Sequence, residues 1–229
     1  MKKFKAVVLL SGGVDSTTCL AVAVEKFGAE NVLALTITYG QKHNREIESA
    51  KKVANHYGVE IVQQDLSEIF RFSNSSLLKN SSEKIRHQSY AEQISEIGHK
   101  TVDTYVPFRN GVFLSFATAI AMSLGADFIY YGAHADDAAG SAYPDCSPKF
   151  KKAMHDAIFE GSGKVCDLIT PFILKNKSDV VAEGLRLKVP YELTWSCYEG
   201  GDKPCGTCAT CIDRKKAFEL NGVKDPCTP

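Results

Sequence analysis

The sequence predicts an α/β protein with a parallel, doubly wound, Rossmann-like sheet and a C-terminal metal-binding region. Strand-like and helix-like runs alternate through the first 65 residues, and a glycine-rich turn joins the first such strand to the first helix. Five of the eight cysteines fall in the last 33 of the 229 residues. We therefore expect one α/β domain over residues 1–190 and a metal-binding segment over residues 191–229 packed on it.

The first part of the chain alternates strands and helices at a regular pace. Residues 6–10 form a continuous apolar run, which is typical of a strand buried on both faces. A helix then extends to Gly28, a β-rich run covers residues 32–38, a second helix ends at Gly58, and a third strand covers residues 59–62. Repeated strand–helix–strand units give a parallel sheet with right-handed crossovers.

The second half of the chain is less regular. Residues 71–100 lack a sustained apolar period, so we expect either a mobile surface excursion or a lid over the site. A buried helix is expected over residues 112–124, a strand over 128–132 and a further helix over 178–187. The remaining residues are rich in Gly, Pro and Cys rather than periodic.

The charge and the hydrophobicity of the chain argue against nucleic-acid and membrane partners. The 27 Lys and Arg residues equal the 27 Asp and Glu residues, so the basic excess that drives nucleic-acid binding is absent. No apolar run reaches the ~18 residues that a membrane span needs. The N-terminal residues lead directly into a strand without a cleavage site, which argues against a signal peptide. We expect a cytoplasmic protein without nucleic-acid or membrane partners.

The turn Ser-Gly-Gly-Val-Asp-Ser at residues 11–16 is the strongest local signal. Glycines between a strand and a helix let the backbone bend and point several N–H groups at one anion, and the positive end of the helix adds to the attraction. The hydroxyls of Ser11, Ser16 and Thr17 can reach the same phosphate oxygens. A simple tight turn with Asp15 or Ser16 as helix cap is the alternative. Neither a Walker motif nor a dinucleotide-binding motif is present.

Cys197, Cys205, Cys208 and Cys211 are spaced C-x7-C-x2-C-x2-C among turn-forming residues. Four thiolates at this spacing suit a tetrahedral zinc ion, and a site without an open position is structural. An iron–sulfur cluster is an alternative, although a ferredoxin-type run would have cysteine where this chain has Lys215. Free or disulfide-bonded thiols are a further alternative.

Polar residues gather where predicted strands end. One block follows the second strand (residues 39–46), one precedes the buried helix (106–110), and one follows the later strand (132–146). Ligands of open α/β sheets bind outside the carboxyl ends of the strands. We therefore expect the first and third blocks to contribute to one site.

The motifs SGGVDS, YGQ, VPFRN, YPDC and SCYEGGDKPCGTCATC together resemble the 7-cyano-7-deazaguanine synthases of queuosine biosynthesis. This family is a branch of the N-type ATP pyrophosphatases, which have the adenine nucleotide alpha hydrolase-like fold. The resemblance extends over nearly the whole chain. It implies an ATP-dependent C–N ligase that converts 7-carboxy-7-deazaguanine and ammonia to 7-cyano-7-deazaguanine through adenylated acid and amide intermediates. It also implies Mg²⁺, a structural Zn²⁺ and a homodimer.

A tRNA-thiolating or other adenylating enzyme of the same superfamily is the alternative function. One position departs from the family, whose members commonly have arginine after YPDC where this chain has Ser147. Lys149 or Lys151 could compensate for the missing arginine.

From the resemblance, the cysteine spacing and the chemistry of the implied substrate, we assign candidate roles to individual residues. The catalytic residues are Asp15, Ser16 and Arg109. The ATP-binding residues are Leu9, Leu10, Ser11, Gly12, Gly13, Val14, Asp15, Ser16, Thr17, Thr18 and Cys19. The substrate-binding residues are Tyr39, Gln41, Arg109, Asn110, Asp136, Tyr143 and Asp145. The metal ligands are Cys197, Cys205, Cys208 and Cys211.

Overall fold

A computed structural model describes residues 4–98 and 100–227 of the chain. Five parallel strands form its sheet in the order β3-β2-β1-β4-β5. Their bounds are β1 Ala6–Leu9, β2 Val32–Thr38, β3 Glu60–Asp65, β4 Phe128–Tyr130 and β5 Asp167–Ile169. The chain reverses its winding between β1 and β4, as in a doubly wound fold, so the predicted fold class is confirmed.

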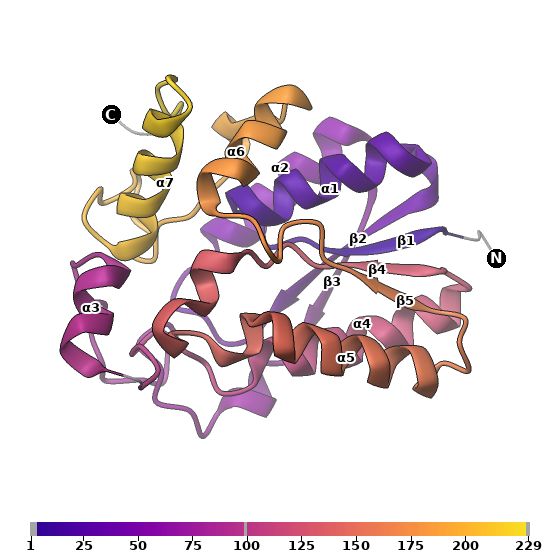
Figure 1. Cartoon of the computed structure of the whole chain (residues 1–229), viewed down its shortest axis with the longest axis horizontal. Helices are drawn as coiled ribbons and strands as arrows, with labels where there is room; N and C mark the ends of the chain where they lie inside the picture. Colours follow the sequence, from indigo (N-terminus) through magenta and orange to yellow (C-terminus); the bar gives the residue numbers. More distant parts are fainter. Residues whose placement is uncertain (1–3, 99, 228–229) are drawn as a thin grey trace.

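Helices cover both faces of the sheet (Figure 1). On one face lie α1 (Val14–Phe27), α2 (Arg45–Tyr57) and α6 (Lys177–Arg186), and on the other lie α4 (Arg109–Leu124) and α5 (Pro148–Gly161). Alternate residues of β1 point into the cores on the two faces of the sheet. Val8 packs in the core under α1, α2 and α6, Val7 packs in the core under α4 and α5, and both are fully buried. Burial on both faces accounts for the continuous apolar run of this strand.

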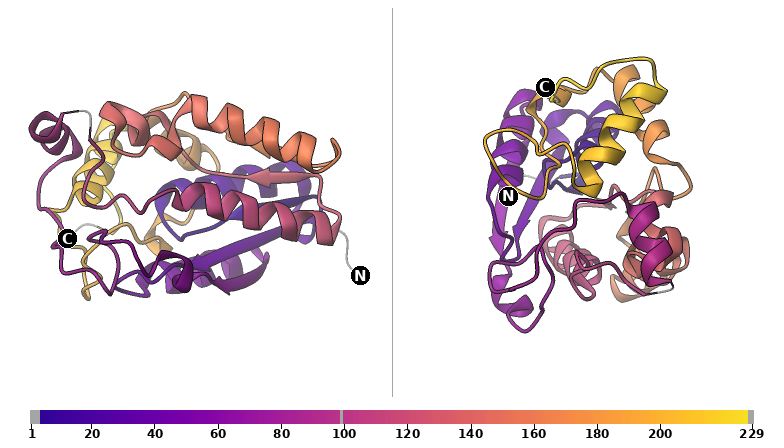
Figure 2. Two further views of the ribbon diagram at one scale, coloured as in Figure 1. Left: turned by 90° about the horizontal axis from the view of Figure 1, so that it is seen from below. Right: turned by 90° about the vertical axis from the view of Figure 1, so that its left-hand side faces the viewer.

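Two further helices lie beyond the carboxyl ends of the strands, α3 (Tyr90–Ile97) and α7 (Ala209–Leu220) (Figures 1 and 2). Their segments meet through His87, whose ring nitrogens lie 2.6 Å from the Thr207 hydroxyl and 2.9 Å from a Glu199 carboxylate oxygen. Short 3₁₀-helices span Ala29–Asn31, Ser67–Phe70, Ala135–Ser141, Pro144–Cys146 and Tyr191–Leu193. The α3 and α7 segments thus form one wall at the end of the sheet where ligands are expected.

The structure corrects several expected boundaries. The third strand runs to Asp65, and the helix expected from residue 112 begins at Arg109. Helices α3, α5 and α7 and strand β5 were not predicted. Residues 71–100 contain α3 and the buried pair Leu77 and Leu78, so this segment is partly folded into the core. None of the described helices has the length and apolar character needed to cross a membrane.

Candidate active site

The pyrophosphate loop, residues 11–16, connects β1 to α1 through a tight hydrogen-bonded turn. The Ser16 hydroxyl accepts from the Ser11 N–H (3.2 Å), lies 3.0 Å from the Ser11 hydroxyl, and donates to the Gly13 carbonyl (3.3 Å). Gly13 caps α1 without a side-chain hydrogen bond, so the alternative of Asp15 or Ser16 as helix cap is wrong. The N-terminal N–H groups of α1 can therefore receive an anion, which the helix dipole also favours.

Gly12 lets this loop lie directly against α2. Its φ of 89° is in the left-handed region that favours glycine, and a Cβ there would collide with the Glu46 carbonyl and lie 2.6 Å from the Ala50 nitrogen. The Gly12 carbonyl accepts from the Trp195 N–H at 2.9 Å. The loop is therefore held between α2 and the segment that leads to the cysteine cluster.

Charged side chains surround Asp15 on the pocket side of the loop. Lys177 Nζ, from the start of α6, donates to Asp15 Oδ2 at 2.5 Å. His134 Nε2 lies 3.6 Å from Asp15 Oδ1 and 3.5 Å from Asp137 Oδ1. Burial raises the pKa of Asp15, but Lys177 and His134 oppose this effect, and the net pKa is below the ordinary value. Asp15 is therefore an anion beside the expected phosphate site.

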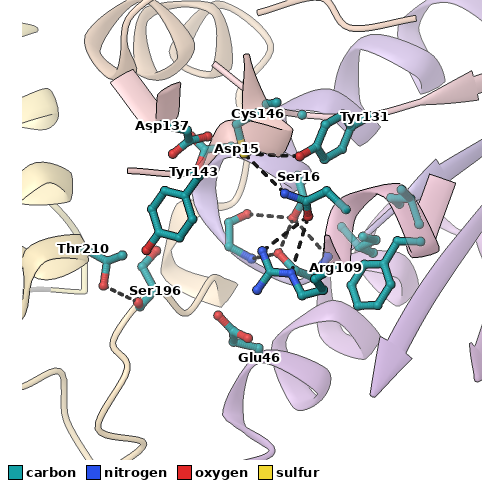
Figure 3. A pocket seen from close by; sticks show the side chains of 18 of the residues that line it. Asp15, Ser16, Glu46, Arg109, Tyr131, Asp137, Tyr143, Cys146, Ser196 and Thr210 are labelled. Carbon is teal, nitrogen blue, oxygen red and sulfur yellow. Dashed lines mark hydrogen bonds between the residues drawn. The ribbon is translucent and has the colours of Figure 1, made fainter. Parts of the chain in front are cut away.

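The pocket itself opens at the crossover between β1 and β4 (Figure 3). The pyrophosphate loop lines it through Ser11, Gly13, Asp15 and Ser16, and the end of β4 and the following turn contribute Tyr131, His134 and Asp137. Ser196, Thr210 and Asp213 of the C-terminal segment close another side. Sheet, turn and metal-binding segment thus share one cavity, as expected for a doubly wound fold.

Arg109 is a guanidinium held in the pocket by aromatic rings. It lies 5.1 Å from the ring centroid of Tyr39 and 5.8 Å from that of Phe113, and it donates to the Asn110 side-chain oxygen at 3.3 and 3.4 Å. Among the described residues, no carboxylate forms an ion pair with it within 4.0 Å. Arg109 can therefore receive an anionic ligand.

Asp145 positions this arginine indirectly. Its Oδ2 accepts from the backbone N–H of Asn110 at 3.0 Å, although the two residues are 35 positions apart, and its side chain is 98% buried (2% exposed). A carboxylate at this place stabilises the N-terminus of α4. Ser147, at the position where the resemblance led us to expect arginine, caps α5 by accepting from the Phe150 N–H at 3.1 Å.

Glu46 is a half-buried carboxylate at the start of α2 that points into the pocket (Figure 3). Burial raises its pKa to about 7, and Arg109 opposes this shift only in part. Within the described residues, neither a hydrogen bond nor an ion pair within 4.0 Å reaches its carboxylate. The group is therefore available to a ligand.

Three tyrosine hydroxyls from distant segments meet at the rim of the pocket. Tyr90 of α3 lies 2.7 Å from Tyr198 of the C-terminal segment and 3.0 Å from Tyr143, measured between hydroxyl oxygens. Thr104 approaches Tyr143 at 2.5 Å. All three tyrosines line the pocket, so the 71–100 segment contributes Tyr90 to its wall.

Cys146 lines the same pocket but is held as a neutral thiol. Its sulfur lies 3.3 Å from the Asn110 side-chain nitrogen and 3.5 Å from the Tyr131 hydroxyl. Burial, and then the negative charge of Asp137, raise the pKa of the Cys146 thiol. A thiolate nucleophile is therefore disfavoured here.

The four cysteines of the C-terminal segment converge as predicted. The Sγ atoms of Cys197, Cys205, Cys208 and Cys211 all lie within 4.8 Å of one another. A tetrahedral zinc ion with Zn–S bonds of about 2.3 Å places its sulfurs about 3.8 Å apart, so one ion fits this cluster. The Cys208 N–H donates to Cys205 Sγ at 3.3 Å, as knuckle-type turns do. Cys227 lies outside the cluster, with its sulfur 3.2 Å from the Tyr191 carbonyl.

The structure brings most, but not all, of the predicted ligand-binding residues to the pocket. Those that line it are Leu9, Leu10, Ser11, Gly13, Asp15, Ser16, Tyr39, Gln41, Arg109, Asn110 and Tyr143. Those outside its lining are Gly12, Val14, Thr17, Thr18, Cys19, Asp136 and Asp145. Asp136 instead accepts from the Lys177 N–H at 2.7 Å, and Cys19 is buried in the core. No role had been assigned to Glu46 or Asp213, which also line the pocket.

Comparison with known proteins identifies the family. Residues 5–222 match the model of the queuosine biosynthesis protein QueC family. The chain belongs to this family. Relatives named 7-cyano-7-deazaguanine synthase include one from Archaeoglobus fulgidus, 44% identical over 97% of this chain and 89% of the relative. Another, from Oceanobacillus iheyensis, is 41% identical over 97% of this chain and 96% of the relative.

A solved structure supports the fold independently of the family. The U34-tRNA thiolase NcsA from Methanococcus maripaludis, determined with its [4Fe-4S] cluster, superimposes with a TM-score of 0.52. The superposition covers 96% of this chain and 68% of the thiolase, at 18% sequence identity. This likeness concerns the fold alone, and family membership favours the synthase over the thiolating alternative.

Proposed function

We propose that this chain is a cytoplasmic, ATP-dependent ligase that converts 7-carboxy-7-deazaguanine and ammonia to 7-cyano-7-deazaguanine. One observation carries the proposal: an anion-binding loop and a half-buried arginine without a carboxylate ion-pair partner among the described residues open into the same pocket. A triphosphate and an organic acid can therefore meet there. The names of the relatives supply the substrate class.

The pyrophosphate loop would hold the leaving group of the first step. The acid's carboxylate oxygen attacks the α-phosphorus of ATP, the bond to the β-phosphate oxygen breaks, and pyrophosphate leaves. Backbone N–H groups at the start of α1, with the Ser11 and Ser16 hydroxyls, would stabilise the charge on the departing pyrophosphate. Ammonia then displaces AMP from the acyl carbon and gives the amide.

The second step repeats the activation on the amide. The amide oxygen attacks a second ATP, pyrophosphate leaves, and loss of AMP with the nitrogen-bound protons gives the nitrile. Arg109 would orient the carboxylate and then the amide oxygen against the α-phosphorus. The tyrosines at the rim would limit the access of water to the adenylated intermediates.

Two metals fit the residues present. Zn²⁺ bound by the four cysteines would fold the C-terminal segment. Mg²⁺ is commonly held by one or two carboxylates together with substrate phosphates. Asp15, whose Oδ1 is buried without a hydrogen-bond partner, and Asp137 offer such oxygens. Mg²⁺ would supply charge neutralisation of the phosphates during transfer.

Turnover assays test the proposal. The protein is incubated with ATP, Mg²⁺, ammonium and 7-carboxy-7-deazaguanine, and AMP, pyrophosphate and the nitrile are measured by mass. We expect two AMP per nitrile, and no stimulation by tRNA. AMP formation that requires tRNA would contradict the proposal. A homodimer is also proposed, and light scattering of the full chain measures it directly.

A further inference from the structure

The pocket holds a cation and an anion that are neighbours but are not bonded to each other. Glu46 lies near Arg109, whose positive charge partly opposes the effect of burial on the pKa of Glu46 (Figure 3). No ion pair within 4.0 Å joins the two within the described ranges 4–98 and 100–227. Arg109 is instead held by aromatic rings and Asn110. An unpaired carboxylate and an unpaired guanidinium in one cavity call for a ligand that satisfies both.

Four other acidic groups in or beside the pocket already have partners. Asp145 accepts from the Asn110 N–H, Asp136 from the Lys177 N–H, and Asp15 from Lys177 Nζ. Asp137 lies beside His134 and accepts from its N–H at 3.4 Å. Glu46 therefore differs from these four in having no donor of its own among the described residues. Asp213, which also lines the pocket, likewise has no hydrogen bond or ion pair there, but its charged neighbours are Lys177, His134, Asp136 and Asp137 rather than Arg109.

The proposed substrate presents a matching edge. Along one side of 7-carboxy-7-deazaguanine lie the 7-carboxylate and the 6-oxo oxygen, which accept hydrogen bonds, followed by N1–H and the 2-amino group, which donate them. A guanidinium suits the accepting half and a carboxylate suits the donating half, in a bidentate pair. An adjacent Arg109 and Glu46 would thus cover the edge from end to end.

We infer that Glu46 is a specificity-determining residue that accepts hydrogen bonds from N1–H and the 2-amino group of the deazaguanine ring. This inference rests on the proposed function and adds a residue to it. The carboxylate oxygens of Glu46 replace water as acceptors, so a purine-like acid that lacks the 2-amino group is disfavoured. Asp136 and Asp145, which were expected from the sequence to bind the substrate, are not assigned this role, because each already accepts a backbone hydrogen bond.

The inference is tested with Glu46→Gln and with Glu48→Gln as a matched control. Glu48 lies in the same first turn of α2, and its side chain is 56% exposed. Kinetic constants are measured with the natural acid and with its analogue that lacks the 2-amino group. Because a hydrogen bond to a charged group contributes about 1.5–3 kcal/mol, Glu46→Gln should lower kcat/KM for the natural acid about 10- to 100-fold.

The two substrates give the decisive comparison. Unaltered protein should prefer the natural acid over the analogue at least about 10-fold, and Glu46→Gln should largely lose this preference with the KM for ATP unchanged. Glu48→Gln should behave as unaltered protein. An unchanged preference in Glu46→Gln, or an increase only in the KM for ATP, overturns the inference and leaves the proposed function standing. No turnover of the acid by unaltered protein overturns both.

Discussion

Asp15 depends on a neighbouring cation for its charge at the phosphate site. Lys177 lies 2.5 Å from it, and the two side chains are only 16% and 26% exposed. Burial raises the pKa of Asp15, and Lys177 provides the larger of the two electrostatic effects that reverse this rise. Without the lysine, the burial effect dominates and the pKa of Asp15 rises.

Lys177→Met should therefore slow pyrophosphate release in the first turnover, measured without ammonia, about 100-fold at pH 7. Because a carboxylate with a raised pKa ionises only at higher pH, the acid limb of the rate–pH profile should move upward. Lys175→Met is the control, since Lys175 is exposed just outside α6. Identical profiles for the two variants would show that the Lys177–Asp15 contact does not affect the reaction.

Glu46 should make binding of the acid depend on pH near neutrality. Its pKa is raised to about 7, chiefly by burial, and the charged or titratable groups that face it are Arg109 of α4 and Tyr39 after β2. Only the ionised form accepts two hydrogen bonds, so affinity should rise with pH and level off about one pH unit above this pKa. Calorimetry without ATP should give a Kd that falls about fivefold between pH 6 and pH 7.

Glu46→Gln should bind the acid with a Kd independent of pH across this range. Calorimetry rather than turnover is the proper measurement, because the fraction of unprotonated ammonia also rises with pH. A pH-dependent Kd that persists in Glu46→Gln would assign the titration to another group.

At the scale of elements, a helix or strand could be predicted from the sequence when its own residues show a regular apolar pattern. Strands β1 and β2 and helix α1 bury aliphatic residues at a regular period, so the sequence reveals them directly. Helix α7 buries Cys211, Arg214 and Phe218 instead. Because neither cysteine nor arginine is aliphatic, the sequence shows no periodic apolar face here and the helix was not predicted. Its Arg214 is neutralised by Asp225, at 2.8 and 2.9 Å, a contact that only the fold creates.

The candidate site shows the same distinction. The pyrophosphate loop is one contiguous hexapeptide and could be predicted, and so could the regularly spaced cysteines. Glu46, Lys177 and Asp213 come from three helices that the sheet topology brings together, so no local pattern unites them. The start of α4 was missed because its stabilising carboxylate, Asp145, is remote in sequence.

The close contact that Gly12 makes in the loop between β1 and α1 can be tested against a second glycine, Gly58, which lies at the end of α2. Gly12 and Gly58 both have positive φ, 89° and 66°, but only at Gly12 would a Cβ meet other atoms within 4 Å. Gly58→Ala should cost about 1–2 kcal/mol of unfolding free energy because of its left-handed backbone. Gly12→Ala should cost at least about 1 kcal/mol more and should also weaken ATP binding.

Urea denaturation gives the two free energies, and calorimetry with ATP gives the affinities. Gly58→Ala should bind ATP as unaltered protein does, because Gly58 lies at the far end of α2. Equal losses of stability in the two variants would contradict this prediction, because they would mean that the loop and α2 move apart to accept the Cβ without lowering the free energy of unfolding.

At the scale of the whole molecule, the C-terminal segment with the four cysteines forms part of the wall of the candidate site. Its residues Ser196, Thr210 and Asp213 line the pocket, and the Trp195 N–H donates to the Gly12 carbonyl of the pyrophosphate loop. Tyr198 adds the contact with Tyr90 of α3. Loss of the metal should therefore disturb the loop and the rim together, although the cysteines themselves need not touch substrate.

Cys205→Ser should lower the zinc content below one ion per chain, lower Tm and reduce substrate-dependent AMP formation at least about tenfold. Structural zinc sites contribute about 10–16 kcal/mol of apparent binding free energy, which a polar segment needs in order to fold. Cys227→Ser is the control, because Cys227 lies outside the cluster and should leave zinc content and activity unchanged. Elemental analysis, calorimetry and the AMP assay measure the three quantities. If Cys205→Ser lost zinc but kept full activity, the pocket wall would be folded by its protein contacts alone, through Trp195 and Tyr198, and the metal would serve only the distal turns.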